Sequence, residues 1–123
     1  MKKILIVDDE KDFCYFVKRN LEITGRFEIV CAYDGTSGVE TARQEKPDLI
    51  LLDILMPGTD GGDVKVMLLN DEKTRKIPVV FLTAIMDKKE FGKEIVKEIR
   101  DHKFIAKPVT PEELIKAVDI VLS

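Results

Sequence analysis

Residues 49–53 read Leu-Ile-Leu-Leu-Asp, four consecutive apolar side chains that end in a carboxylate. Residues 4–8 have the same form, Ile-Leu-Ile-Val-Asp. An apolar run without alternation is typical of a strand buried on both faces, as in a parallel sheet covered by helices. Both stretches therefore predict central strands that bring an acidic residue to the edge where parallel strands end.

Three further short apolar runs recur along the chain. The five predicted strands are Ile4–Val7, Phe27–Ala32, Leu49–Leu52, Val79–Leu82 and Phe104–Ala106. Glu28 interrupts the second run, so we place that strand nearer an edge of the sheet. Because helical segments separate the runs, right-handed crossovers predict an α/β doubly wound (βα)5 flavodoxin-like fold, a five-stranded parallel sheet with helices on both faces.

The segments between the runs and after the last one carry helix signals. Helices are predicted around Phe13–Leu21, Val39–Ala42, Asp63–Leu69, Phe91–Ile99 and Leu114–Val121. The last is the best marked, because Thr110 is a suitable N-cap, Pro111 follows in the first turn and Glu113 completes a capping box. The third has no clear apolar stripe.

Length and composition describe one globular domain. The 123 residues predict a single domain over residues 1–123 with no output domain, and 45% of them are apolar and 35% charged. With 23 acids and 20 bases and no basic stripe, direct nucleic-acid binding is not expected. No apolar run is long enough for membrane insertion. Cys14 and Cys31 form no Cys-x-x-Cys pair and are expected to be reduced thiols of a cytoplasmic protein.

Polar residues follow four of the predicted strands at the edge where ligands bind in doubly wound sheets. They are Asp8-Asp9-Glu10, Asp53, Thr83-Ala84 and Lys107-Pro108. Each has a structural alternative when taken singly: the acids could cap helices or turns, Thr83 could be a strand residue and Lys107 a solvated charge. All four alternatives would have to hold at once, so the combination favours a functional site.

Electrostatics narrow the chemistry of that site. Two carboxylates about 4 Å apart repel by roughly 4 kcal/mol at an effective dielectric of about 20, so converging acids need cations. Lys107 offers one charge, and an all-oxygen site suits Mg²⁺ or Mn²⁺. A metal, a hydroxyl, a lysine and a free carboxylate are the parts of a phosphoryl-transfer site. The chain has no G-x-x-x-x-G-K-[ST] or G-x-G-x-x-G stretch, which argues against direct nucleotide use.

These motifs resemble, over essentially the whole chain, the receiver domain of a two-component response regulator. The residues that carry the resemblance are ILIVDDE at 4–10, LLDILMPG at 51–58, TA at 83–84 and KP at 107–108. The resemblance implies that Asp53 accepts a phosphoryl group from a phosphohistidine. It further implies that Asp9, Asp53 and the backbone carbonyl of Leu55 ligate Mg²⁺, with Asp8 contacting the ion through water.

The same resemblance assigns roles to the later motifs. Lys107 would pair with Asp53 and then with phosphoryl oxygens, to which the Thr83 hydroxyl and the Ala84 amide would also donate. A cis peptide is expected between Lys107 and Pro108. Phe104 matches an aromatic switch position that would move inward with Thr83, although a static core aromatic is an equally weighted alternative.

Partners follow from the family as well. The resemblance implies a sensor histidine kinase or histidine phosphotransfer protein as the phosphodonor and a downstream effector protein that binds the switched face. Receivers occur as monomers or as dimers formed through the fourth helix, fifth strand and fifth helix. Here Ile99–Lys103 lacks the family's usual Gly-Ala pair and the interval from Thr83 to Lys107 is long, so we expect this region to be rebuilt.

Phosphoryl lifetime can also be predicted. Leu55 and Ile85 occupy positions that flank the path of attacking water in this family, and neither can orient a water by hydrogen bonding. We therefore expect slow self-dephosphorylation, in a signalling protein that catalyses its own aspartyl phosphorylation and is not a conventional turnover enzyme.

Three rival functions remain beside this one. A degenerate receiver would act only as an unphosphorylated interaction module, which the joint presence of Asp8, Asp9, Asp53, Thr83 and Lys107 disfavours. A Mg²⁺-dependent aspartyl-phosphate phosphatase would normally carry its nucleophile after the first strand and add a cap domain. A flavodoxin-like cofactor binder would need a phosphate-cradling loop rich in Ser, Thr and Gly.

Overall fold

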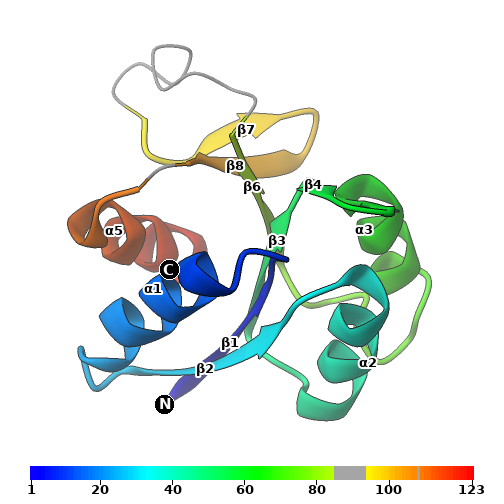
Figure 1. The fold of residues 1–123 in the computed structure, drawn as a ribbon, viewed down its shortest axis with the longest axis horizontal. Coiled ribbons are helices and arrows are strands. Elements are labelled where there is room, and N and C mark those ends of the chain that lie inside the picture. The colour runs from blue at the N-terminus through cyan, green and yellow to red at the C-terminus, as the bar shows by residue number, and fades with distance from the viewer. Residues whose placement is uncertain (85–93, 108) are drawn as a thin grey trace.

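The computed structural model describes residues 1–84, 94–107 and 109–123, and these form one sheet layered between helices (Figure 1). The sheet order is β2 (Phe27–Ala32), β1 (Lys2–Val7), β3 (Leu49–Asp53), β6 (Val79–Thr83), β8 (His102–Ala106) and β7 (Lys97–Ile99). The first five strands pair in parallel, and β7 pairs with β8 antiparallel. The doubly wound fold is confirmed, with the second strand at an edge.

Two helices cover each face of the sheet in the described part of the chain. Helices α1 (Lys11–Glu22) and α5 (Pro111–Leu122) lie on one face, and α2 (Gly35–Glu45) and α3 (Gly61–Leu69) lie on the other (Figure 1). None of these helices is both long enough and apolar enough to cross a bilayer.

The unbroken apolar runs are explained by two cores. On β1, Ile4 and Ile6 pack toward α1 and α5, whereas Leu5 and Val7 pack toward α2 and α3. All four side chains are buried, because successive residues of a strand point to opposite faces. The two cores hold β1 rigidly, and β3 in the same way, up to the acidic residues that end them.

Helix α5 begins as its sequence predicts. The Thr110 hydroxyl accepts from the Glu113 backbone N–H at 3.1 Å, and the Glu113 carboxylate accepts from the Thr110 N–H at 2.9 Å. This reciprocal capping box, with Pro111 at the first helical position, satisfies backbone donors that the helix leaves unpaired. The N-cap is thereby fixed two residues after Pro108, which lies outside the described residues.

The predicted helix Phe91–Ile99 is wrong at its end. Residues 85–93, including Phe91, lie outside the described residues, but Ile99 is in strand β7 and pairs with His102. Arg100 and Asp101 join β7 to β8 with φ values of 49° and 66°. Two positive φ angles are what a type I′ hairpin turn requires, so the rebuilt region expected before β8 is a hairpin.

A second, two-stranded ladder follows β3. Strands β4 (Leu55–Met56) and β5 (Thr59–Asp60) are antiparallel and joined by Pro57-Gly58, where Gly58 has a φ of 72°. Proline followed by glycine with positive φ is the pattern of a type II turn. This hairpin returns the chain toward Asp53, and Asp60 then caps α3 by accepting from the Gly62 N–H at 2.7 Å.

Candidate functional site

The site lies at the carboxyl edge of the sheet. Asp8 follows β1, Asp53 ends β3 and Lys107 follows β8, and the sheet order brings these strand ends to one edge. The Lys107 N–H donates to the Thr83 carbonyl at 2.8 Å, which holds the lysine backbone against β6. Four motifs that are far apart in the sequence therefore meet as predicted.

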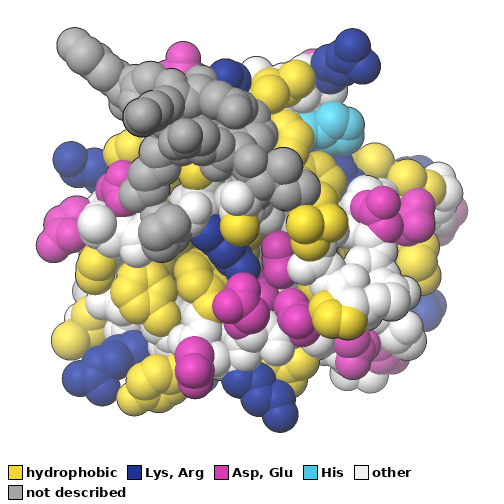
Figure 2. All heavy atoms as spheres, turned by 45° about the horizontal axis from the view of Figure 1, so that its top comes forward, with side chains coloured by type: hydrophobic (Ala, Val, Ile, Leu, Met, Phe, Trp, Pro, Cys, Tyr) yellow, Lys and Arg dark blue, Asp and Glu magenta, His cyan; other side chains and the backbone are white. Residues whose placement is uncertain are grey.

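Lys107 is the centre of the site. Its Nζ lies 2.6 Å from Asp8 Oδ2, 3.1 Å from Glu10 Oε1 and 3.7 Å from Asp53 Oδ2. Near the middle of Figure 2, one basic side chain can be seen among acidic ones on the face that this edge presents. The Lys107 side chain is only 10% exposed and those of Asp8 and Asp53 are buried, so these two ion pairs are poorly screened by solvent.

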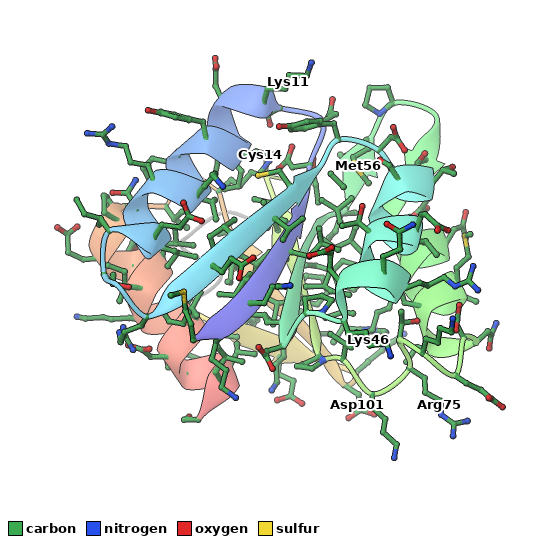
Figure 3. The ribbon with its side chains drawn as sticks, turned by 90° about the horizontal axis from the view of Figure 1, so that it is seen from below. Lys11, Cys14, Lys46, Met56, Arg75 and Asp101 are labelled. Carbon is green, nitrogen blue, oxygen red and sulfur yellow. The ribbon has the colours of Figure 1, made fainter. Side chains whose placement is uncertain are left out.

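Asp8 is fully buried, and both of its carboxylate oxygens have partners. Oδ1 accepts from the Glu10 N–H at 2.9 Å, and Oδ2 accepts from Lys107 Nζ. Cys14 points from α1 toward the sheet (Figure 3), and its Sγ donates to the Asp8 carbonyl at 3.3 Å. These contacts fix Asp8 as the anchor of the lysine.

Asp53 is buried but less well paired than Asp8. The side chain is 8% exposed, its Oδ1 accepts a long bond of 3.3 Å from the Leu55 N–H, and its ion-pair partner among the described residues is Lys107 at 3.7 Å. Burial raises the pKa of Asp53 to about 6, and the charges of Asp8 and Asp9 add to this, while Lys107 and the Leu55 N–H oppose it. The carboxylate with the weakest partners is thus the one available for chemistry.

The lysine stays charged in this environment. Burial by itself lowers the pKa of Lys107, but hydrogen bonds from its ammonium group to Asp8 and Glu10, together with the charges of Asp8 and Asp53, outweigh burial and raise it. Among the described residues, one ammonium charge then faces three carboxylates, so this part of the site carries an excess of negative charge. A divalent cation would neutralise this excess.

The group of converging carboxylates differs from the predicted metal ligands, because it contains Glu10 and does not contain Asp9. Asp8, Glu10 and Asp53 each place an oxygen within 4.8 Å of the other two, and such an all-oxygen donor set fits Mg²⁺. Asp9, predicted as a direct ligand, is exposed and is not one of the three. Glu10 belongs to the sequence motif at 4–10 but had no predicted role. Its position directly after Asp8 and Asp9 was the only sequence feature that could have indicated a place in the site.

Thr83 and Ala84 lie at the end of β6, beside β3 and β8. Thr83 is buried and pairs with Ala106, and Ala84 is exposed. Their predicted donation to a phosphoryl group stays a prediction, as do the metal contact of the Leu55 carbonyl and the cis peptide before Pro108.

Phe104 is partly buried and stacks on Phe81 with ring centroids 5.5 Å apart. Its role as a moving switch also stays a prediction.

Gly61 is a structural requirement of the site that the sequence did not reveal. A Cβ atom at this position would lie 2.6 Å from the Asp53 carbonyl oxygen and 2.8 Å from the Ile54 Cα. The Gly61 N–H donates to the Ile54 carbonyl at 2.9 Å. Only glycine lets the start of α3 approach the Asp53 backbone this closely.

Comparison with known proteins agrees with this architecture. Residues 4–119 match the response regulator receiver domain family. The chain is 38% identical to protein PilH of Pseudomonas aeruginosa over 123 residues, which cover 100% of this chain and 99% of PilH. Chemotaxis protein CheY4 of Vibrio cholerae superposes with a TM-score of 0.83 at 28% identity, covering 99% of both chains. The N-terminal domain of a response regulator receiver protein from Methanoculleus marisnigri gives a TM-score of 0.70 at 31% identity, covering 100% of this chain and 98% of that one.

The fold and the strand-end site define a protein of the two-component signalling class. This chain belongs to the response regulator receiver domain family. Receiver domains generally bind Mg²⁺ and interact with histidine kinases or phosphotransfer proteins and with effectors.

Proposed function

We propose that Asp53 accepts a phosphoryl group from a phosphohistidine of a histidine kinase or phosphotransfer protein, and that the change at this site alters a protein-binding face. The observation that carries the proposal is the contrast between Asp8 and Asp53. Lys107 is hydrogen-bonded to Asp8 and lies 3.7 Å from Asp53, which leaves Asp53 as the available nucleophile beside a fixed cation.

In the proposed step, an Asp53 carboxylate oxygen forms a bond to phosphorus as the bond from phosphorus to the imidazole nitrogen breaks. The imidazole nitrogen keeps the electron pair and takes a proton. Lys107, the Thr83 hydroxyl and the Ala84 N–H stabilise negative charge on the phosphoryl oxygens. Lys107 already lies within ion-pair distance of the Asp53 oxygen.

Asp53 and Asp8, with Asp9 and the Leu55 carbonyl as expected from the family, would hold Mg²⁺, or Mn²⁺ in its place. Bound there, the ion would neutralise charge on the transferring group. The convergence of Asp8, Glu10 and Asp53 supports a cation at this edge, because three carboxylates carry more negative charge than Lys107 compensates.

The partners and the compartment are part of the proposal. A downstream effector would bind the switched face. Dimerisation through the fourth helix, fifth strand and fifth helix stays an expectation, since the predicted fourth helix begins within residues 85–93, outside those described, and its end is strand β7. The cytoplasm is the expected compartment, in keeping with Cys14 and Cys31 as free thiols.

Slow loss of the phosphoryl group is expected as well. Leu55 is 63% exposed and immediately follows the Asp53 turn, where its side chain offers no hydrogen bond to an attacking water. Ile85, the other residue predicted to flank the water path, lies outside the described residues.

Intact-mass measurement after incubation with acetyl phosphate or phosphoramidate tests the proposal. We expect one phosphoryl adduct that requires Mg²⁺ and that is absent from Asp53→Asn. Asp63→Asn is the matched control, because Asp63 is an exposed acid in the first turn of α3, and it should be phosphorylated like the wild type.

Two results would contradict the proposal. A folded, Mg²⁺-saturated wild type without an adduct would favour the unphosphorylated interaction module. Release of many phosphates per chain from a phosphomonoester would favour the phosphatase instead.

A further inference from the structure

Glu10 occupies the N-cap position of α1 without capping the helix. Its backbone is extended, with φ −82° and ψ 99°, and its side chain accepts no hydrogen bond from the first turn. The carboxylate turns instead to the site, where Oε1 accepts from Lys107 Nζ at 3.1 Å. Because the side chain does not cap α1, its contribution is to the lysine rather than to the helix start.

The contacts of Lys107 are distributed unevenly between two strands. The two carboxylates within hydrogen-bond distance of Nζ, Asp8 and Glu10, both belong to the β1–α1 segment. The ring centroid of Phe13, in the first turn of α1, is 4.4 Å from the same Nζ. Asp53, on β3, is farther from Nζ than either of the two acids, at 3.7 Å.

We propose that Glu10 is a positioning residue that holds the Lys107 ammonium on the β1–α1 side and thereby slows phosphorylation of Asp53. This inference rests on the proposed function. Glu10 and Asp8 take up two of the three N–H donors of the ammonium group and hold it on their side, so its approach to an incoming phosphoryl group stretches these two hydrogen bonds. Without the Glu10 carboxylate, Lys107 keeps its anchor on Asp8 and moves toward Asp53 more readily.

The exposure of the Glu10 side chain limits how much its removal can change the phosphorylation rate. The Glu10 side chain is 65% exposed, whereas that of Asp8 is buried, so the Glu10 ion pair is screened by solvent and weak. A pair of this kind supports a rate change of about two- to fivefold.

The test is single-turnover phosphorylation of Glu10→Gln at saturating Mg²⁺, with acetyl phosphate and with phosphoramidate, read by intact mass. Glutamine keeps the size of the side chain and removes its charge. We expect the rate at saturating donor to rise about two- to fivefold with both donors. Asp12→Asn is the control, since Asp12 is an exposed acid in the first turn of the same helix, and it should react like the wild type.

Three further results separate the positioning role from its rivals. The gain should disappear when Glu10→Gln is combined with Lys107→Met, because the effect passes through the lysine. The ¹⁵N resonance of the Lys107 ammonium should shift in Glu10→Gln and stay in place in Asp12→Asn, a readout that does not require Lys107→Met to fold. A gain with the more highly charged acetyl phosphate alone would overturn the positioning role, since it would show simple repulsion of the donor.

Two further outcomes distinguish failure of the positioning role from failure of the proposed function. A wild type that is phosphorylated while Glu10→Gln reacts at the same rate, or more slowly, overturns the positioning role and leaves the proposed function intact. A wild type that takes no phosphoryl group overturns both.

Discussion

Lys107 and Lys65 are both partly buried lysines, but the two regions of the molecule around them differ in their effect on the lysine pKa. Lys107 lies at the carboxyl edge of the sheet among Asp8, Glu10 and Asp53, and the net effect of its surroundings is a raised pKa. Lys65 lies on α3 beside the β7–β8 hairpin, 5.2 Å from the Phe81 ring centroid and 2.7 Å from His102 Nδ1. Burial lowers the pKa of Lys65, and the charge of Asp101 opposes this only in part.

The difference is one of chemical surroundings. The groove beside Lys65, about 320 Å³ in volume, is lined by apolar side chains that include Val66, Leu69 and Phe81. At the strand edge, by contrast, several negative charges are held close together, at a cost that a bound cation would relieve and that a phosphoryl group would change. A region with such unresolved charge is suited to respond to a ligand. The following predictions test that contrast.

Lys107→Met should have the largest effect on stability. It leaves fully buried Asp8 without its cation, and removal of one partner of a buried ion pair costs about 3–5 kcal/mol of unfolding free energy. Lys65→Met should change the unfolding free energy by less than about 1 kcal/mol. Urea denaturation with and without Mg²⁺ measures both, and Mg²⁺ should restore more stability to Lys107→Met than to the wild type. Equal losses in the two variants would remove the contrast.

Asp53→Asn should stabilise the Mg²⁺-free protein at neutral pH. The pKa of this carboxyl is about 6 in the folded protein, above its ordinary value of 3.8, so its ionisation disfavours the folded state increasingly between pH 3.8 and 6 and by a constant amount above pH 6. The variant should gain about 2–3 kcal/mol at pH 7, and the gain should shrink as the pH falls through 6 and vanish below 3.8. Thermal unfolding as a function of pH measures this, and a gain that is the same at all pH values would refute the electrostatic cause.

Gly61→Ala should disturb the site through the backbone. The added methyl would meet the Asp53 carbonyl oxygen at 2.6 Å, so the turn after β3 must shift, at a cost of about 1–2 kcal/mol in unfolding free energy. We also expect about tenfold slower phosphorylation, because small displacements of reacting groups lower rates strongly. Gly62→Ala is the matched control, since its methyl would meet the flexible Asp60 side chain at 3.1 Å. Similar rates in both variants would show that the close approach is unimportant.

The smallest effect is expected at the hairpin. Arg100→Asn combined with Asp101→Gly places residues that favour positive φ at the two turn positions and should raise the unfolding free energy by about 0.5–1 kcal/mol. Asp101 precedes β8, whose other end leads to Lys107, and it lies well away from Cys14 (Figure 3), so the phosphorylation rate should not change. A loss of stability would contradict the described turn.

Sequence reasoning succeeded where a residue's environment depends on its near neighbours. The runs ending at Asp8 and Asp53 could be identified as strands because burial on both faces leaves no polar position. Thr110 and Glu113 marked a helix start through a local hydrogen-bond pattern. Topology rules then placed the strand ends together without any information on side-chain contacts.

Sequence reasoning failed where the structure of a segment depends on partners that are distant in the sequence. Ile99 fitted a helical spacing with Phe91, yet Lys97–Ile99 became a strand by pairing with β8 across a turn that no glycine marks. At the site, the sequence showed three successive acids but not which of them turn inward. That choice follows from the backbone after β1, which buries Asp8, exposes Asp9 and returns Glu10 to Lys107.

Strand β7 also limits how this sheet can associate with other chains. Since β7 lies outside β8, the outermost hydrogen-bonding edge that the described residues form on this side carries Lys97 and Glu98. The opposite edge, β2, exposes Glu28. Charged side chains on edge strands disfavour pairing with a strand of another molecule, so both borders of the sheet resist the edge-to-edge growth that leads to aggregation.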